Sequence, residues 1–457
     1  MTTLITENFK VELAKKLYDS LDLGLNSSLP ADRQNYFYAI LGRQIAWQDE
    51  ENPPTPTQGT NCLNILYKNA LFAKRLTNAQ ASFVARRIDW TSGTVYDPYS
   101  DIICNFSFDL DFYVMNSSFE VFKCLDNNNG AESTAEPDIT LSTTSLEEPY
   151  IETADGYKWK YMYTLSSIQR QKYLTLEWMP VSTNKFVSAA AIGGSIDVVK
   201  ITNSGNNYVD GSAQDIISVV GDGTGVQLKA NVVDGQIVDV IIQDRGLNYT
   251  YTDITIEDVA GGVGTSAELQ SIVAPPEGHG YDPVYELGAS KLMFDCDFDG
   301  SDTSFLSEND YRQVFIVLNP DAQSTGLPAT AEKYTCYYRI KTSPGLGNFN
   351  EDEVVYQGTT LESATFTANV VHFDATQNYL YVNNIRGSAT INQSIKGGST
   401  GSIRIMNGFE NPSMKLYSGK VLYISNTLAV SRNPDQTDRV RFILNFDSWR
   451  GIHDYSF

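Results

Sequence analysis

The order of apolar and polar residues predicts a chain of many strands, with helices near its beginning. Close to the N-terminus, apolar residues recur at every fourth position, which is typical of an amphipathic helix that ends near Gly24. Residues 36–43 form a continuous apolar run, as in a buried strand. Residues 60–76 return to helical spacing, with Thr60 as a candidate N-cap. The first apolar stripe consists of Ile5, Phe9, Leu13, Leu17 and Leu21.

Beyond residue 110, short apolar runs alternate with turn residues, and this pattern predicts strands. The pair Asp155-Gly156 is a turn signal in front of one run, and Asn319-Pro320 stops another. The expected strands are 114–115, 120–125, 157–165, 311–318, 349–356, 368–373, 379–382, 420–425 and 439–446.

Residues 193–274 contain an internal repeat with a period of 41 residues. Each copy is predicted to form a strand, a Gly-x-Asn-Tyr turn, a second strand, a Gly-rich turn and a third strand. Because one copy is too small to bury its own apolar face, we expect the two copies to stack on one another. The matching pairs are Ile196/Ile237, Val199/Val240, Ile201/Ile242, Gly205/Gly246, Asn207/Asn248, Tyr208/Tyr249, Gly221/Gly262, Gly223/Gly264 and Thr224/Thr265.

Composition and charge narrow the classes of function. The 457 residues are 42% hydrophobic and 12% aromatic, which is enough for two to three domains with sizeable cores. A net charge of −22 argues against binding to nucleic acid or to an anionic membrane. No stretch approaches the roughly 18–20 apolar residues of a membrane helix, and the N-terminus lacks the pattern of a secretory signal. The five cysteines are widely spaced, so we expect buried free thiols.

The segment 86–99 holds the densest set of candidate functional side chains. It combines arginines, aspartates, a tryptophan and tyrosines with two turn signals, but it contains no His, Cys or Lys to act as base or nucleophile. Arg–Asp pairs and aromatic anchors are typical of rigid segments and of interfaces. We therefore interpret it as architectural or interface-forming, with catalysis as the alternative. The residues given this role are Arg87, Asp89, Trp90, Tyr96, Asp97, Tyr99, Trp159 and Tyr161.

The run from Asp295 to Asp302 has the alternating oxygen ligands and the glycine of a calcium loop. Asp295, Asp297 and Asp299 would then be the calcium ligands. Position twelve of such a loop is Leu306 instead of Glu, so we favour a solvated acidic turn and expect no cofactor.

Other motifs favour structure over chemistry. Gly397-Gly398-Ser399-Thr400-Gly401 matches a nucleophile elbow, but a strand is predicted after it where the elbow needs a helix, so we expect a Gly-rich hairpin or bulge. Residues 221–225 lie between predicted strands, which disfavours a phosphate loop.

The histidines are too far apart for zinc, and we expect His279 to shape a turn. Carboxylate pairs such as Asp109/Asp111 and Glu147/Glu148 carry no geometric information in sequence. The histidines are His279, His372 and His453.

Several segments, in this order, resemble one family, the baseplate wedge subunit of T-even-type contractile-tailed phages (the gene-eight product). The resemblance covers the first 190 residues or so and both ends of the second half. The similar segments are 37–47 with Leu41-Gly42-Arg43, 86–99, 122–126, 155–161, 311–320, 418–423, 435–437 and 442–446.

The resemblance implies a division of the chain into a frame with two insertions, because the family's known form is shorter. Residues 1–190 would be the N-terminal part of the wedge-subunit core and 193–274 an inserted β-repeat domain. Residues 275–335 would continue the core, 336–410 would be an inserted β-rich module, and 411–457 would complete the core. Taken together, the patterns and the resemblance predict a mainly β, multidomain (α+β) fold with β-sandwich-like domains, a few helices near the N-terminus and a small inserted β-repeat domain.

The family also implies a function without catalysis. The chain would be a homodimeric structural protein of the virion tail baseplate, assembled in the cytoplasm of the host bacterium. Its partners would be itself and neighbouring wedge subunits of the gene-six, gene-seven and gene-ten types, with no nucleic acid and no membrane. It would help the baseplate change shape when the sheath contracts. Two alternatives stay open: a glycan-binding or glycan-cleaving tail protein, and a calcium-stabilised adhesin.

Overall fold

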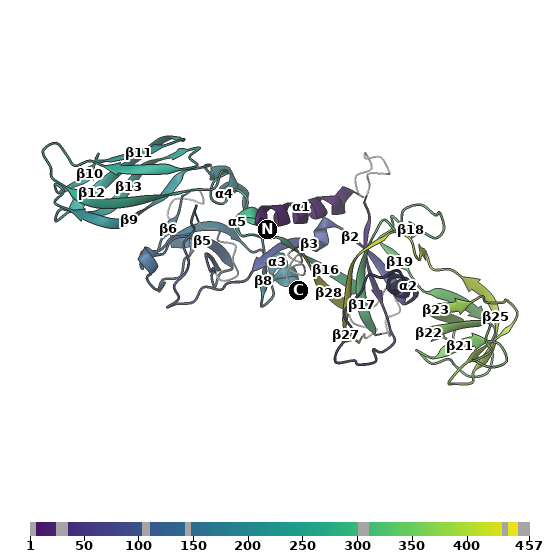
Figure 1. The fold of residues 1–457 in the computed structure, drawn as a ribbon. Helices are drawn as coiled ribbons and strands as arrows, with labels where there is room; N and C mark the ends of the chain where they lie inside the picture. Colours follow the sequence, from purple (N-terminus) through teal and green to yellow (C-terminus); the bar gives the residue numbers. More distant parts are fainter. Residues whose placement is uncertain are drawn as a thin grey trace, which may run out of the picture. The chain divides into compact units, whose positions relative to one another are not determined.

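The computed structural model describes residues 6–23, 35–102, 110–141, 148–299, 310–431 and 437–446. Its fold is mainly β, with antiparallel sheets and few helices, as the sequence predicts (Figure 1). The chain forms two compact units that interleave along the sequence. Unit 1 consists of Met1–Ala14, Ser82–Met293 and Asn445–Phe457, and unit 2 of Lys15–Ala81 and Phe294–Leu444.

The N-terminal helix α1 (Glu7–Leu23) confirms the predicted helix, but its buried face differs from the predicted stripe. Val11, Ala14 and Leu21 are buried, whereas Phe9 is 52% exposed. The spacing of four residues identified a helix, yet a stripe at that spacing drifts around the helix axis, so it does not stay on one buried face. Within the described residues, no helix is long and apolar enough to cross a membrane.

The core of unit 1 is a four-stranded antiparallel sheet in the order β4-β5-β7-β6. Its central strand β5 is buried on both faces from Glu120 to Leu125, including Lys123. The sheet's strands are β4 (Tyr113–Met115), β5 (Glu120–Asp126), β6 (Ile151–Glu152) and β7 (Lys158–Thr164). Around it lie β3 (Ala81–Arg86), α3 (Ser167–Tyr173), β8 (Trp178–Pro180), α4 (Lys185–Ala190) and α5 (Pro283–Glu286).

The two repeat copies are in contact, as expected, and the contact is made by strands of one copy pairing with strands of the other. The first strand of copy one, β9, pairs with the last strand of copy two, β15. The last strand of copy one, β12, pairs with the first strand of copy two, β13, and the middle strands β11 and β14 pair with each other. The strands are β9 (Ile196–Asn206), β10 (Gly211–Gln214), β11 (Ile217–Gly221), β12 (Thr224–Val233), β13 (Gln236–Leu247), β14 (Thr252–Ile256) and β15 (Thr265–Val273).

The repeated tyrosines and glycines explain this exchange. Tyr208 of copy one packs on Gly264 of copy two, where an added Cβ would lie 2.2 Å from the ring. Tyr249 of copy two packs in the same way on Gly223 of copy one, at 2.4 Å. Each tyrosine is buried in a space that only glycine leaves open, so the repeated pattern encodes contacts between the copies.

Unit 2 contains a five-stranded sheet in the order β19-β2-β1-β17-β27, with β1 and β17 as fully buried central strands. The helix predicted over 60–76 is wrong beyond Lys68. Helix α2 (Thr60–Lys68) ends there, and Ala70–Leu76 is strand β2, because it pairs with β1 on one side and β19 on the other. The other strands are β1 (Phe37–Gly42), β17 (Tyr311–Leu318), β19 (Lys333–Thr335) and β27 (Lys420–Val430).

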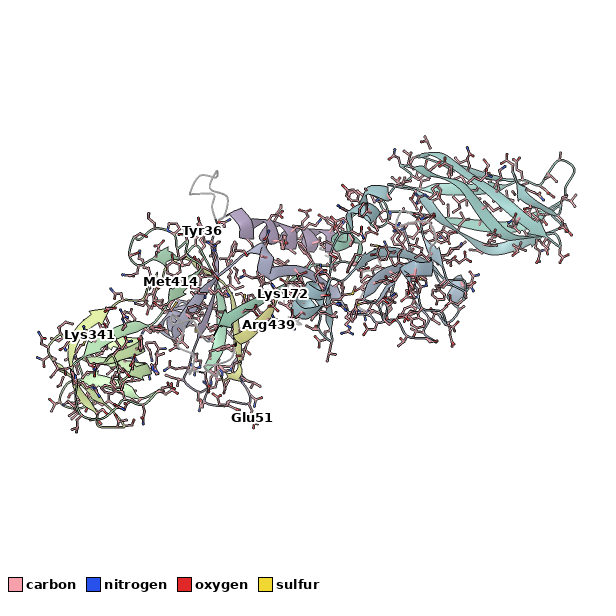
Figure 2. All side chains as sticks on the ribbon, turned by 180° about the vertical axis from the view of Figure 1, so that it is seen from behind. Tyr36, Glu51, Lys172, Lys341, Met414 and Arg439 are labelled. Carbon is pink, nitrogen blue, oxygen red and sulfur yellow. The ribbon has the colours of Figure 1, made fainter. Side chains whose placement is uncertain are left out.

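Residues 338–410 of unit 2 form a closed barrel in the order β20-β23-β22-β21-β24-β25. Its interior is apolar, whereas Lys341 on β20 is exposed (Figure 2). The predicted strand 349–356 begins only at Val354. The strands are β20 (Tyr338–Thr342), β21 (Val354–Gln357), β22 (Phe366–Asp374), β23 (Tyr379–Gly387), β24 (Ser394–Gly397) and β25 (Ile403–Glu410). The remaining strands are β16 (Lys291–Asp299), β18 (Asp321–Ala322), β26 (Met414–Lys415) and β28 (Thr437–Asn445).

Candidate functional site: the core around residues 86–99

The segment 86–99 is held along the edge of the four-stranded sheet of unit 1. The Trp90 amide donates to the Met115 carbonyl at 2.9 Å, and the Met115 amide donates to the Ile88 carbonyl at 2.7 Å. Farther along, the Tyr99 amide donates to the Cys124 carbonyl at 2.8 Å. These backbone hydrogen bonds fix the segment at both of its ends, so the position of each side chain relative to the sheet is fixed as well.

Trp90 begins a chain of hydrogen bonds that ends on a carboxylate. Its Nε1 donates to Ser133 Oγ at 3.0 Å, and that hydroxyl donates to Asp155 Oδ2 at 3.1 Å. The same carboxylate oxygen accepts from the amides of Thr134 and Ala135 at 2.7 and 2.9 Å. Burial raises the pKa of Asp155, but these bonds and one from a threonine hydroxyl outweigh it, so the pKa lies below its ordinary value. Asp155 therefore ties three segments together as an ionised acceptor.

Tyr96, Tyr157 and Trp159 form a closed aromatic cluster. The ring of Trp159 meets Tyr96 edge-on at 5.6 Å between centroids and stacks on Tyr157 at 5.4 Å. Tyr157 Oη accepts from the Tyr96 amide at 3.3 Å and donates to the Ala131 carbonyl. All three rings are almost completely buried, and within the described residues Trp159 Nε1 has no acceptor. Packing, more than hydrogen bonding, holds Trp159 in place.

The other predicted residues are also engaged within unit 1. Arg87 pairs with Asp89 at 2.9 Å and donates to the Thr175 carbonyl, also at 2.9 Å, although Asp89 stays half exposed. Asp97 Oδ2 accepts from the Asp111 amide at 2.9 Å. Tyr161 meets Phe122 edge-on at 5.6 Å.

An architectural or interface role for 86–99 predicts that Trp90 and Tyr96 are buried against their own fold or against a partner. Burial is confirmed for Tyr96, which is 1% exposed. Trp90 is only partly buried, although it packs against the same apolar core. Its indole nitrogen donates to the fully buried Ser133, whereas the next residues along the chain, 91–93, are exposed.

Tyr99 leads to a buried charge cluster that sequence reasoning missed. Its ring lies 4.1 Å from Lys123 Nζ and meets the His279 ring edge-on at 4.7 Å. Lys123 Nζ lies 3.0 Å from Glu286 Oε2 and 3.1 Å from His279 Nδ1. The three polar residues are at least nine-tenths buried. The available signal was Lys123 itself, a lysine inside the apolar run Val121–Leu125.

The acidic run at 295–299 is a strand, β16, which corrects the expected solvated turn. Asp295 is 1% exposed and pairs with Arg441 at 2.9 Å and Arg439 at 3.3 Å. Arg439, on β28, also pairs with Asp297 at 2.9 Å. The side chain of Asp299 and residues 300–309 lie outside the described part. In the described part, no group of three or more His, Cys, Asp or Glu side chains could hold a metal ion.

The Gly-rich loop 397–401 encloses a carboxylate. It joins β24 to β25, so the predicted hairpin is confirmed. Glu353 accepts from the amides of Ser399 and Thr400 at 3.2 and 3.1 Å and from both hydroxyls at about the same distances. Burial raises the pKa of Glu353, but these donors outweigh it, so the pKa lies below its ordinary value. Ser399 therefore acts as a hydrogen-bond donor to Glu353.

The remaining candidates are dispersed. Residues 221–225 connect β11 to β12, as predicted. His372, on β22, lies 3.4 Å from Glu351. Cys124, Cys296 and Cys336 are buried free thiols, as expected, whereas Cys62 is partly exposed. His453, Cys104, Asp109 and Glu147 lie outside the described residues.

Comparison with the models of known protein families finds no match, and a search of curated proteins finds none either.

Proposed function

We propose that this chain is a structural subunit of the tail baseplate wedge of a contractile-tailed bacteriophage. Its role would be to assemble the baseplate with neighbouring wedge subunits and to rearrange with them when the sheath contracts. The proposal rests on the collinear resemblance of its segments to the gene-eight product of T-even-type phages. No chemistry on a substrate is part of it.

One observation supports the proposal above the others. Segments 86–99, 122–126 and 155–161, which carry the resemblance, meet in one core of unit 1. Trp90 reaches Asp155 through Ser133, Tyr96 packs on Trp159, and Phe122 packs on Tyr161. Residues scattered over more than 70 positions pack together there, so they help to specify the fold, and a resemblance in these residues is what a shared fold would produce.

The proposed mechanism needs surfaces that pair with other subunits and pack differently in two states. Obligate assemblies use large apolar and aromatic interfaces, and a trigger selects between two such packings. Exposed apolar side chains are present in both units, for example Leu176 at 92% and Leu346 at 79%. They are available for contacts of this kind.

The first experiment is co-expression with wedge subunits of the gene-six, gene-seven and gene-ten types. We expect size-exclusion chromatography with light scattering to show a homodimer of the chain alone and a stable complex with at least one of these partners. The variant Leu176→Ser is the matched control for surface contacts. Leu176 is exposed, so its replacement alters the surface and leaves the core unchanged. A well-folded monomer that binds none of the partners would refute the proposal.

The second experiment locates the chain in an intact particle. A short affinity tag fits after Gly261 in unit 1 or after Gly326 in unit 2, where a Cβ would meet no neighbouring atom. We expect a gold label on either tag to appear at the baseplate. Label along the tail tube, on the capsid or on no particle would contradict the assignment.

A further inference from the structure

The β-repeat domain leaves and rejoins the rest of unit 1 at one place. The Gly194 amide donates to the Pro275 carbonyl at 3.0 Å, so the chain entering the domain touches the chain leaving it. The outgoing segment then runs through His279 to α5, which carries Glu286. Whatever holds this segment against β5 also holds the base of the domain.

At this place one buried carboxylate, Glu286, lies next to two basic side chains, Lys123 and His279. Lys123 Nζ is within hydrogen-bond distance of both Glu286 Oε2 and His279 Nδ1. His279 Nδ1 also lies 3.4 Å from Glu286 Oε2. A charged lysine can only donate, so while Lys123 is charged its contact with His279 Nδ1 needs a neutral imidazole that accepts there and carries its proton on Nε2. The second oxygen of Glu286 accepts from the Gly280 amide at 2.6 Å. With His279 neutral, these hydrogen bonds need one cation, Lys123, and one anion, Glu286.

Among the described residues around Glu286, we find no further carboxylate that is free to pair with a protonated His279. Asp197, on β9, accepts from Ser195 Oγ at 2.9 Å and from Arg245 at 3.1 Å. Lys160, on β7, adds positive charge and donates to the Glu148 carbonyl at 2.8 Å. The remaining titratable neighbours are Tyr99, whose ring faces Lys123, and Asp101, which raises the pKa of Tyr99.

We propose that Lys123, His279 and Glu286 form an acid-sensitive clasp that fastens the base of the β-repeat domain to β5. When His279 Nδ1 takes up a proton, it can no longer accept from Lys123. Two adjacent cations then share one carboxylate in a buried site, which is unfavourable. The segment from Pro275 to Glu286 then separates from β5, and the base of the domain stays attached to β5 only through the packing of Leu125 on Val198 and Ile272. This inference is independent of the proposed baseplate function.

The direction of the pH dependence follows from the pKa values. Burial, and then the charge of Lys123, lower the pKa of His279 below its ordinary value of 6.5. The clasped state thus binds fewer protons than the open state, so its stabilisation is complete above about pH 6.5 and is lost as the pH falls. Burial raises the pKa of Glu286, but its basic neighbours, with the charge of Lys123 first, lower it overall, so its contribution is lost only at more acid pH, below 4.5.

Hydrogen exchange measured by mass spectrometry on the full chain tests the clasp. After correction for intrinsic exchange, we expect peptides covering 275–287 to exchange several-fold faster at about pH 5.5 than at about pH 7.5. His279→Gln, which can accept from Lys123 at any pH, should remove this dependence. His372→Gln is the matched control, because it replaces a partly exposed histidine of the barrel, and it should behave as the unaltered chain. Protection that is independent of pH, or that stays dependent in His279→Gln, would overturn the proposal.

A second measurement on the unaltered chain covers the case that His279→Gln does not fold. The chain has only three histidines, so their ring protons can be resolved by NMR and that of His372 assigned with its variant. We expect one resonance to titrate below pH 6.5, together with the loss of protection at 275–287. If no histidine titrates below its ordinary range, the clasp does not exist.

Discussion

At the scale of single residues, unit 1 depends on side chains whose polar atoms are used inside the fold. Trp90, Ser133 and Asp155 form one hydrogen-bonded chain, and Asp97 holds the backbone of Asp111. The residue types alone, arginine, aspartate and tryptophan, would suit a binding site equally well. Within the described residues, the hydrogen-bond partners of these polar atoms lie in the same chain.

Trp159 offers a quantitative test at this scale. It is fully buried and its indole nitrogen has no acceptor among the described residues, so its contribution is packing alone. We expect Trp159→Ala to lower the free energy of unfolding of unit 1 by about 3–5 kcal/mol, and Trp159→Phe to cost clearly less. Urea denaturation followed by near-UV circular dichroism measures both. Tyr251→Ala, at a 59% exposed aromatic, is the control and should change it by less than about 0.5 kcal/mol. Equal effects at 159 and 251 would show that the cluster is not a core.

At the scale of elements, local patterns predicted most strands, whereas their partners could not be inferred. Alternation and turn residues indicated the runs that became β5, β7, β17 and β27. The helix over 60–76 was half wrong because a short apolar run fits either a helix or a strand buried on both faces, and pairing with β1 decides between them. Lys123 and His279 are 156 positions apart, so no local pattern could bring them together.

The exchange of strands between repeat copies gives a prediction for elements. Gly223 and Gly264 lie under the buried rings of Tyr249 and Tyr208, which leave no room for a methyl group, and at Gly223 the Leu247 carbonyl is nearly as close. We expect Gly223→Ala and Gly264→Ala each to destabilise the β-repeat domain by about 1–3 kcal/mol, measured as a lower melting temperature. Gly408→Ala is the control, since its Cβ would make only an ordinary contact at 3.5 Å. If both repeat variants melt like the control, the tyrosines do not interlock the copies.

At the scale of the whole molecule, both segments interpreted as insertions have their ends side by side, as an insertion requires. Ser413 and Thr335 exchange hydrogen bonds at 2.8 and 3.1 Å at the two ends of the barrel, and Gly194 meets Pro275 at the base of the β-repeat domain. A segment with adjacent ends can be gained or lost without moving the chain on either side of it. The resemblance predicts where insertions interrupt a frame, and the structure adds that the ends of both predicted segments are adjacent in space.

Deletion of the β-repeat domain tests the interpretation that residues 193–274 are an insertion. We expect a chain lacking 195–274, with Gly194 joined to Pro275 through a short glycine linker, to fold with the near-UV spectrum of its aromatic core retained. Its melting temperature should fall, because Leu125 loses its contacts with Val198 and Ile272. The matched deletion of 207–264 also joins paired residues, Asn206 and Thr265, but it leaves β9 and β15 as a lone hairpin with an unpaired apolar face. That chain should aggregate, since a two-stranded hairpin is at best marginally stable. Should the larger deletion unfold the chain while the smaller one is tolerated, residues 193–274 would belong to the frame itself.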